Sequence, residues 1–285
     1  MHIFFRDEMV VKDFGLTAPA HQKQCLLMDL LYQRPATVMV SEFEPMDWNR
    51  WAAVHDSDMV SAIRSGDPDL FDHATVPVSP QMVASLKYDG GSFIAGASAA
   101  IEHGCAFSPT SGFHHAHWTQ PGPLCLLNAL PLAALHALSH SPIQRVLILD
   151  CDYHRGDGTE DILMRLGDER IVHESLGYRF SRRQQAGDYL ETIERIAMQI
   201  EAAEFDFVIY QAGMDVLLGD PAGGGLLTLA ETKQRDRRVF EACARASIPI
   251  VWNLAGGYPR EGDSPFAAVL EGHVNSFEVA VQAFG

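Results

Sequence analysis

Residues 146–161 read VLILDCDYHRGDGTED, and this stretch decides the fold. Its first four residues are all apolar, which predicts a strand buried on both faces of a parallel sheet. Asp150, Asp152 and His154 follow directly, and a Gly-Asp-Gly turn comes after them. Polar residues at the end of a buried strand mark the carboxyl edge of an open α/β sheet, where such proteins build their sites. A solvated turn with a capping aspartate is the alternative interpretation of this stretch taken alone.

Strand and helix patterns alternate outward from this stretch over most of the chain. The alternation predicts an α/β fold with a doubly wound, mostly parallel central sheet. No linker, low-complexity run or repeat divides the sequence, so we expect a single domain over residues 1–285. The predicted strands are residues 2–5, 37–40, 146–149, 170–174, 205–210 and 249–253. The predicted helices are residues 20–32, 46–54, 58–64, 80–88, 93–103, 124–138, 159–165, 187–203, 228–246 and 265–283, with a loop from 103 to 120.

The charge balance bears on the class of partner. The chain has 21 lysine and arginine residues against 37 aspartate and glutamate residues, a formal net charge of −16. This excess argues against binding to a nucleic-acid backbone, because no basic patch offsets the repulsion. It suits cationic substrates such as lysine side chains or polyamines, although a mildly acidic balance is also ordinary for cytosolic proteins.

The cysteine pattern and the lack of targeting segments indicate the compartment. The five cysteines are scattered, odd in number and contain no CxxC pair, so a disulfide framework and a thiolate zinc site are not expected. The N-terminal residues lack the apolar core of a signal peptide, and no apolar run is long enough to cross a bilayer. We therefore expect a cytoplasmic protein with no membrane partner; the sequence makes no prediction of the oligomeric state.

Polar side chains also follow other predicted strands. Asp215 comes shortly after the strand at 205–210, and Tyr258 follows two glycines after the strand at 249–253. A histidine pair, His114 and His115, lies in the long loop before residue 120. Carboxyl ends of parallel strands share one edge, so we expect these groups to meet in one pocket. Taken singly, the histidine pair is also compatible with a position on the surface. Asp215 and the Gly-Gly-Tyr segment are each also compatible with a simple turn.

The assembled groups suit metal-assisted hydrolysis of an amide. Asp152, His154 and Asp215 supply three protein ligands, the number that leaves a catalytic zinc open to water and substrate. Such a metal acidifies water and polarises a carbonyl group. His114 and His115 would supply a general base and a general acid.

Three further side chains complete this hydrolytic site. Asp150 and Asp157 are available to orient the two imidazoles. Tyr258 would donate its hydroxyl to the oxyanion that develops during the attack of water on the carbonyl.

Six motifs follow one another along the chain: GFHHA (112–116), CLLNA (125–129), DCDYHRGDGTED (150–161), SL (175–176), AGMDVLLGDPAGG (212–224) and AGGY (255–258). In this order they resemble the motifs of a known family, the histone deacetylase and acetylpolyamine amidohydrolase superfamily. The resemblance covers roughly residues 90–270. It implies the arginase-like fold, a three-layer α/β/α sandwich, and zinc-dependent deacylation of an N-acyl amine, most directly an acyl-lysine in a protein or peptide.

The resemblance also implies a role for each site residue. It assigns zinc to Asp152, His154 and Asp215, although iron(II) would suit the same donors. It makes His115 the general base, oriented by Asp157, and pairs His114 with Asp150. Tyr258 matches the tyrosine that polarises the acyl carbonyl. The family further implies a structural potassium ion, held partly through backbone carbonyls, at Asp150, Asp152, His154, Ser175 and Leu176. The residues expected to line the substrate tunnel are Phe113, Leu124, Tyr178 and Phe180.

Three positions depart from the family pattern. Arg155 stands where relatives usually have His or Gln, and we expect it to pack or form an ion pair away from the metal. Ala255 replaces the glutamate common before Gly-Gly-Tyr. Leu124 replaces an aromatic wall of the tunnel, so the tunnel would admit a longer acyl group or a substrate other than acetyl-lysine.

Other functions remain open alternatives. An acetylpolyamine or other small-molecule amidohydrolase is the nearest, because the Asp-Tyr-His spelling at 152–154 is similar to that branch. A non-catalytic protein that keeps the fold is a second alternative, although this chain retains the ligands and the tyrosine. An arginase-type hydrolase with two manganese ions is a third, but the Asp and His set suits one catalytic metal.

Overall fold

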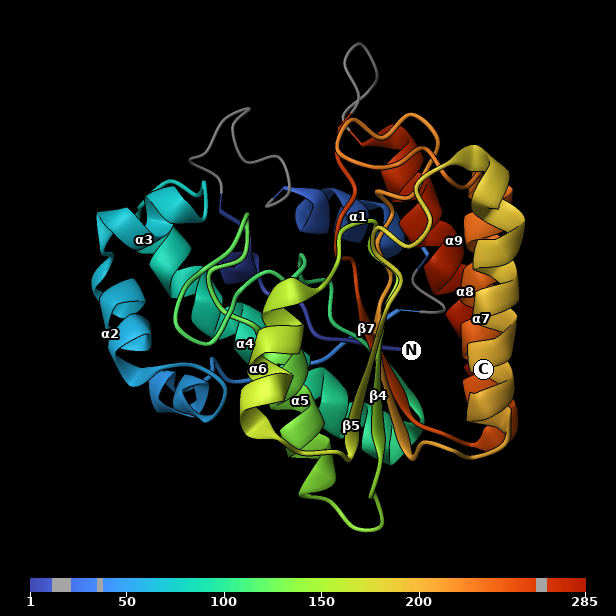
Figure 1. Ribbon diagram of the computed structural model, residues 1–285, viewed down its shortest axis with the longest axis horizontal. Helices are drawn as coiled ribbons and strands as arrows, with labels where there is room; N and C mark the ends of the chain where they lie inside the picture. Colours follow the sequence, from blue (N-terminus) through green and yellow to red (C-terminus); the bar gives the residue numbers. More distant parts are fainter. Residues whose placement is uncertain (12–21, 35–37, 260–265) are drawn as a thin grey trace.

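A parallel sheet forms the centre of the computed structural model, which describes residues 1–11, 22–34, 38–259 and 266–285 (Figure 1). The sheet has seven strands in the order β2-β1-β3-β7-β6-β4-β5, and neighbouring strands pair in parallel. This arrangement confirms the predicted α/β fold. The strands are β1 (His2–Ile3), β2 (Met39–Val40), β3 (Cys105–Phe107), β4 (Val146–Asp150), β5 (Ile171–Ser175), β6 (Phe207–Gln211) and β7 (Ile250–Asn253).

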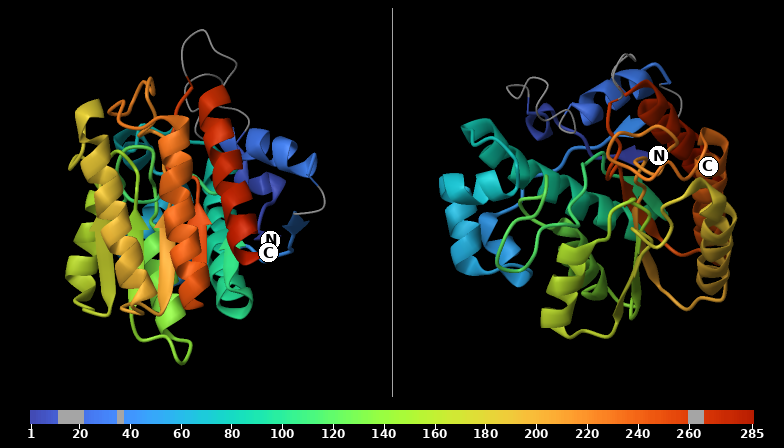
Figure 2. Two further views of the ribbon diagram at one scale, coloured as in Figure 1. Left: turned by 90° about the vertical axis from the view of Figure 1, so that its right-hand side faces the viewer. Right: turned by 45° about the horizontal axis from the view of Figure 1, so that its top comes forward.

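Helices cover both faces of the sheet and give the predicted three-layer sandwich (Figures 1 and 2). One face carries α7 (Ala186–Glu201), α8 (Leu229–Ala246) and α9 (Ala267–Phe284). The other carries α4 (Pro80–His103), α5 (Ala129–Leu138) and α6 (Asp157–Leu166), with α2 (Ser57–Ser65) and α3 (Pro68–His73) beyond α4. Helix α1 (Lys23–Tyr32) packs against α9. None of the helices in the described part of the chain has the length and apolarity that crossing a bilayer requires.

Strand β4 sets the level of the carboxyl edge. All of its residues are buried, as the apolar run predicted. Its last residue, Asp150, pairs with Gln211 of β6 on one side and with Ser175 of β5 on the other. The segments that leave β4, β5 and β6 therefore begin at the same height. This register brings the polar residues after each strand to one place.

Helix α4 corrects one prediction. The sequence predicted two helices, at 80–88 and 93–103, but Pro80–His103 is one continuous helix that includes Gly90 and Gly91. The glycines are needed for close packing instead: a Cβ atom on Gly90 would lie 2.6 Å from Met46 and 2.7 Å from Trp51, and one on Gly91 would lie 2.4 Å from a backbone oxygen of Glu44. The helix accepts the propensity cost of two glycines because the segment before α2 crosses it there.

Several boundaries also differ from the predictions. Strand β3 lies in what we predicted to be loop, because three residues are too few to show a period. Helix α5 begins at Ala129 and not at 124, since the Asn128 side chain accepts from Leu130 N and caps it there. The segment at 46–54 forms a 3₁₀ helix, Trp48–Ala53, and α3 was missed. Predicted positions 20–21, 37 and 265 lie outside the described residues, and a single domain over 1–285 stays a prediction.

A buried ion pair supports the segment that follows β6. Arg235 on α8 is fully buried, and its Nη1 donates to the carbonyl oxygen of Gly213 at 2.8 Å. Its Nε donates to Asp236 Oδ1 at 2.7 Å, and Asp236 also accepts from the hydroxyls of Tyr210 and Ser276. The guanidinium thus joins α8 to the backbone two residues before Asp215.

Substituting Arg235 tests this support. We expect Arg235→Met to lower the free energy of unfolding by about 3–5 kcal/mol, because Asp236 would keep a buried charge without its partner. Denaturant unfolding measures the change. Arg237→Met on the exposed face of α8 is the matched control and should change stability by about 0.5 kcal/mol or less. Equal effects of the two substitutions would contradict the structural role of Arg235.

Candidate active site

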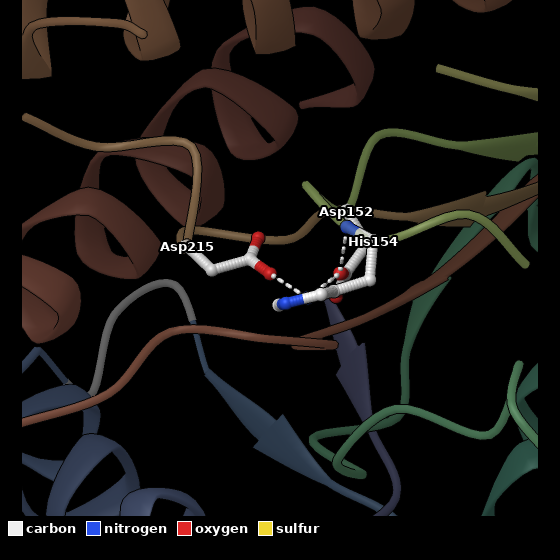
Figure 3. A group of neighbouring side chains, drawn as sticks. All are labelled: Asp152, His154 and Asp215. Atoms are coloured by element: carbon white, nitrogen blue, oxygen red, sulfur yellow. Dashed lines mark hydrogen bonds and ion pairs between the residues drawn. The ribbon is translucent and has the colours of Figure 1, made fainter. Parts of the chain in front are cut away.

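Three side chains converge where the segments after β4 and β6 meet (Figure 3). His154 Nδ1 lies 3.2 Å from Asp152 Oδ1 and 3.0 Å from Asp215 Oδ2. One potential ligand atom from each residue falls within 4.8 Å of the others, a spacing that a single metal ion can span. Both carboxylates are buried, while His154 is half-buried. The structure therefore brings together the three residues predicted as metal ligands.

Backbone amides fix the orientation of both carboxylates. Asp152 Oδ1 accepts from His154 N at 2.9 Å, and Asp152 Oδ2 accepts from Gly256 N at 2.7 Å. Asp215 Oδ1 accepts from Tyr153 N at 2.9 Å. These bonds leave Asp215 Oδ2 directed at the imidazole of His154. The backbone of these turns therefore helps to orient the carboxylates of Asp152 and Asp215.

The charges in this cluster are not balanced by the three residues themselves. Burial, reinforced by the charge of Asp152, raises the pKa of Asp215 to about 8. Burial opposes protonation of His154, yet its hydrogen bonds to Asp152 and Asp215 raise its pKa to about 11. The negative charge of the neighbouring carboxylates contributes to both shifts, because it disfavours a second carboxylate and favours a cation.

The surroundings also fit a cation. Two carboxylate oxygens and one imidazole nitrogen are the donors that catalytic zinc and iron(II) accept. Gly256 lies over the cluster, where a Cβ atom would come 2.6 Å from Asp152 Oδ2 and 2.5 Å from Asp215 Oδ2. Glycine therefore keeps this approach open, and a larger residue would fill it.

Each of the two predicted imidazoles has the carboxylate partner expected for it. His114 Nδ1 lies 2.8 Å from Asp150 Oδ2, and His115 Nδ1 lies 2.7 Å from Asp157 Oδ1. Burial opposes protonation of His114, but the charges of Asp150 and Asp152 raise its pKa to about 9. The rings of His114 and His115 are 4.1 Å apart, and His115 is 5.9 Å from His154. The two carboxylates hold Nδ1 of each ring and leave Nε2 for chemistry.

Tyr258 lines the same pocket as His114, His115 and Asp152. Burial, with the charges of Asp152 and Asp215, raises the pKa of its phenol above the ordinary value, so the hydroxyl remains a donor. Its backbone N donates to Asp220 Oδ2 at 2.8 Å. The predicted grouping of Tyr258 with the histidines is therefore observed.

Two supporting residues were not singled out from the sequence. Asp220, which lies within the AGMDVLLGDPAGG motif (212–224), bonds the backbone of Tyr258 and also accepts from Ala222 N at 2.9 Å. Gln211 donates from Nε2 to Asp150 Oδ1 at 3.1 Å. Gln211 is the polar last residue of a buried strand, a signal of the same kind that identified Asp150.

Lys23 is the largest omission. This lysine on α1 is fully buried, and its Nζ lies 2.5 Å from the carbonyl oxygen of Ala255, 3.2 Å from that of Gly256 and 3.4 Å from that of Gly257. Burial lowers its pKa to about 8, although the charges of Asp215, Asp152 and Asp220 favour the ammonium. Lys23 thus fastens the turn before Tyr258 to a distant helix. A lysine at an apolar position of the predicted first helix was the available sequence signal.

Ala255 belongs to the turn that Lys23 contacts. Ala255 is buried and has a φ of 54°, a left-handed conformation that is strained for a residue with a Cβ atom. Its carbonyl oxygen accepts the shortest of the Lys23 hydrogen bonds. Helix α1 therefore bonds the backbone of residue 255, the position at which the family pattern has a glutamate.

The predicted tunnel residues do not all reach the site. Leu124 lines the pocket, and the ring of Tyr178, which is 60% exposed, packs 5.7 Å from that of His154. Phe113 is buried against Phe93. Phe180 packs instead against Tyr189 of α7, at 5.6 Å. Of the two aromatic candidates after β5, Tyr178 is the one whose ring packs against His154.

The remaining predicted residues lie next to the cluster of Asp152, His154 and Asp215. Arg155 forms an exposed two-bond ion pair with Glu160, which is the role expected for a side chain that points away from the metal. Ser175 accepts from Gly156 N at 3.0 Å, and Leu176 N donates to the carbonyl oxygen of Asp150 at 2.9 Å. These residues adjoin the backbone of Asp150, while a potassium ion there stays a prediction.

Comparison with known proteins identifies the family of these motifs. Residues 19–176 and 165–270 match the histone deacetylase domain. An uncharacterized protein of Picosynechococcus sp. is 29% identical, over 73% of this chain and 74% of that protein. Histone deacetylase 2 of Arabidopsis thaliana is 29% identical over 65% of this chain, and acetylpolyamine amidohydrolase 1 of Pseudomonas aeruginosa is 27% identical over 56%. The matched regions span 52% and 53% of those two relatives.

The fold has a solved counterpart. The crystal structure of the HDA15 HD domain superposes with a TM-score of 0.80, covering 99% of this chain and 88% of that one at 18% sequence identity. At this identity the likeness concerns the fold, and it agrees with the α/β/α sandwich.

Substituting Lys23 tests its contact with the turn before Tyr258. We expect Lys23→Met to lower the free energy of unfolding by about 1–3 kcal/mol, because the carbonyl oxygen of Ala255 would lose its buried donor. Denaturant unfolding with Lys233→Met as the control measures this, since Lys233 bonds Asn275 in a partly exposed position. Wild-type stability of Lys23→Met would show that the turn holds without the ammonium.

Proposed function

The chain belongs to the histone deacetylase domain family, and on that premise we propose that it hydrolyses the amide bond of an N-acyl amine. The observation that carries the proposal is the convergence of Asp152, His154 and Asp215 beside two carboxylate-bound imidazoles. Its most direct substrate is an acyl-lysine in a protein or peptide. Zinc is the proposed cation, and iron(II) suits the same donors. A divalent cation would polarise the carbonyl and lower the pKa of a water molecule.

The imidazoles divide the proton transfers. His115 accepts the proton of the attacking water at Nε2, because Asp157 engages its Nδ1 at 2.7 Å. His114 is the more buried ring, and its raised pKa favours the protonated form beside Asp150. In this scheme an imidazole then returns a proton to the leaving amine. Each step requires the tautomer that the carboxylate partner fixes.

Tyr258 stabilises the charge that develops on the carbonyl oxygen. Its hydroxyl stays protonated at neutral pH because its pKa is raised, so it donates throughout the reaction. Asp220 holds the backbone of Tyr258, and Lys23 holds the three residues before it. These contacts fix the backbone that carries the donor before substrate binds, which reduces the reorganisation that the reaction needs.

A small-molecule substrate is the second candidate. The net charge of −16 favours a cationic acylated polyamine, and one relative is named as an acetylpolyamine amidohydrolase. Both substrates present the same amide, so the catalytic residues are the same in either case. The two differ in what lies beyond the amine.

Metal binding is the first prediction of this proposal. Chelator-treated protein should bind one equivalent of Zn²⁺ in calorimetry, with a rise in Tm as the cation stabilises the folded state. Asp215→Asn should reduce the affinity by more than the roughly 10–100-fold that losing a supporting group costs. Asp188→Asn, an exposed carboxylate on α7, is the control. Two equivalents bound at this cluster would favour the two-metal alternative.

A loss of turnover in Tyr258→Phe is the second prediction of the proposed function. On an acetyl-lysine peptide, kcat should fall by roughly a hundredfold or more with one oxyanion donor removed. The same assay on an N-acetylated diamine separates the two substrate classes by their kcat/KM. Unchanged turnover in the variant would remove Tyr258 from the mechanism, and no turnover of either amide by metal-loaded wild-type protein would overturn the proposed function.

A further inference from the structure

A third histidine, His117, lies directly after the two imidazoles of the proposed reaction. Its side chain is 26% exposed, so most of the ring is buried against the start of α6. Its Nε2 lies 3.7 Å from Asp157 Oδ2, and its Nδ1 lies 3.7 Å from Asp161 Oδ2. The two aspartates are one helical turn apart on α6. The ring of His117 is therefore placed between two carboxylates, one of which is the partner of His115.

The backbone of His117 is held on both sides. Its N–H donates to the carbonyl oxygen of Gln120 at 2.9 Å, and its carbonyl oxygen accepts from His55 Nδ1 at 2.8 Å. His55 is the donor in this contact, because its Nε2 accepts from Asn128 N at 2.8 Å and burial lowers its pKa to about 4. The neutral ring of His55 carries its single proton on Nδ1. These bonds fix the point from which the His117 side chain leaves the loop.

The first turn of α6 packs directly against the same loop. The N–H of Thr159 donates to the carbonyl oxygen of His114 at 3.0 Å. A Cβ atom on Gly158 would lie 2.4 Å from the carbonyl oxygen of Ala116, so the helix and the loop are in backbone contact there. This packing restricts movement of the His117 ring relative to the two carboxylates of α6.

Asp157 is shared between two imidazoles. Its Oδ1 accepts from His115 Nδ1 at 2.7 Å and from Gly158 N at 3.0 Å, while its Oδ2 faces His117. Burial opposes ionisation of Asp157, but its hydrogen bond to His115 and the charges of His115 and His117 keep its pKa below the ordinary value. The two carboxylate oxygens therefore have separate partners, and the general base is only one of them.

The two nitrogens of His117 determine how the ring can act on Asp157. A neutral imidazole has one N–H and can donate to only one of two carboxylates, whereas an imidazolium donates from both nitrogens. The separations of 3.7 Å are longer than hydrogen bonds and within the range of ion pairs. The imidazolium is thus the form that attracts both carboxylates. In that form the ring holds Oδ2 of Asp157 by charge while Oδ1 stays with His115.

We propose that His117 is a positioning residue of the hydrolysis and that it acts through Asp157. By holding the second oxygen of Asp157, it keeps the first oxygen on Nδ1 of His115 and leaves Nε2 of His115 directed at the attacking water. The inference rests on the proposed function, since it assigns a support to the general base of the same reaction. The alternative is a purely structural tie between the loop and α6.

A double-mutant cycle decides whether His117 acts through Asp157. With metal-loaded protein and an acetyl-lysine peptide, His117→Gln should lower kcat by about tenfold and leave KM within about twofold, as expected for a group that supports a catalytic side chain. His73→Gln, an exposed histidine at the end of α3, is the matched control and should keep the wild-type kcat. In the Asp157→Asn background, His117→Gln should cause no further loss, because the carboxylate through which it acts is gone.

The same cycle separates positioning from a defect in folding. A loosened fold would lower kcat in the Asp157→Asn background as well, so a second tenfold loss in the double variant would overturn the proposal. A wild-type kcat in His117→Gln would also overturn it, since Asp157 would then hold His115 without help.

A measurement that needs no catalysis separates this inference from the proposed function. In metal-loaded protein without substrate, the proton between His115 Nδ1 and Asp157 should give a downfield NMR resonance, assigned by its loss in His115→Gln. His117→Gln should shift or broaden this resonance, and His73→Gln should leave it as in wild type. If neither amide is hydrolysed but the resonance responds to His117→Gln, the support of Asp157 stands and the proposed reaction fails. If acyl-lysine is hydrolysed and neither kcat nor the resonance responds, the reaction stands and the positioning proposal fails.

Discussion

Two carboxylates, Asp152 and Asp215, are buried side by side at the carboxyl edge of the sheet, and the surrounding structure compensates for their charge. Burying one carboxylate is costly, and burying two together raises the pKa of one of them, as the value of about 8 for Asp215 records. Amide groups of Tyr153, His154 and Gly256 supply part of the compensation. The remainder calls for a cation at His154, which is why the cluster suits a metal site and would be a poor structural core.

The cations behind the site come from outside the sheet. Arg235 on α8 bonds the backbone of Gly213, and Lys23 on α1 bonds the turn of Ala255–Gly257. One supports the segment that carries Asp215, and the other supports the segment that carries Tyr258. Helices far apart in the sequence therefore fix the two loops whose relative position the proposed chemistry requires. A loop held only by its own turn would leave that distance variable.

The site residues that lie at the ends of strands were predicted from the sequence. The residues that follow buried apolar runs lie together as expected, because β4 and β6 end at the same level of the sheet. These residues are Asp150, Asp152, His154 and Asp215. The sequence did not predict contacts made by helices to the site. Lys23 lies on an apolar helix with no motif around it, and its three acceptors are more than 230 residues later. Helix α4 was predicted as two helices for the same reason, because the residues that pack against Gly90 and Gly91 come from another segment: Met46, Trp51 and Glu44.

Residues at the strand ends and residues at the pocket wall differ in how a substitution affects the site. The groups assigned to the amide chemistry sit at strand ends or are fixed by carboxylates there, so a change in one disturbs charge balance for the rest. Leu124 lines the pocket and the ring of Tyr178 packs against that of His154, and both residues lie in turns outside the strand ends. Substitution at such positions alters the space beside the amide without changing the compensation of Asp152 and Asp215. Departures from the family pattern at the pocket wall are therefore compatible with an intact site. Under the proposed function they affect which acyl group is accepted, while the chemistry of amide cleavage stays the same.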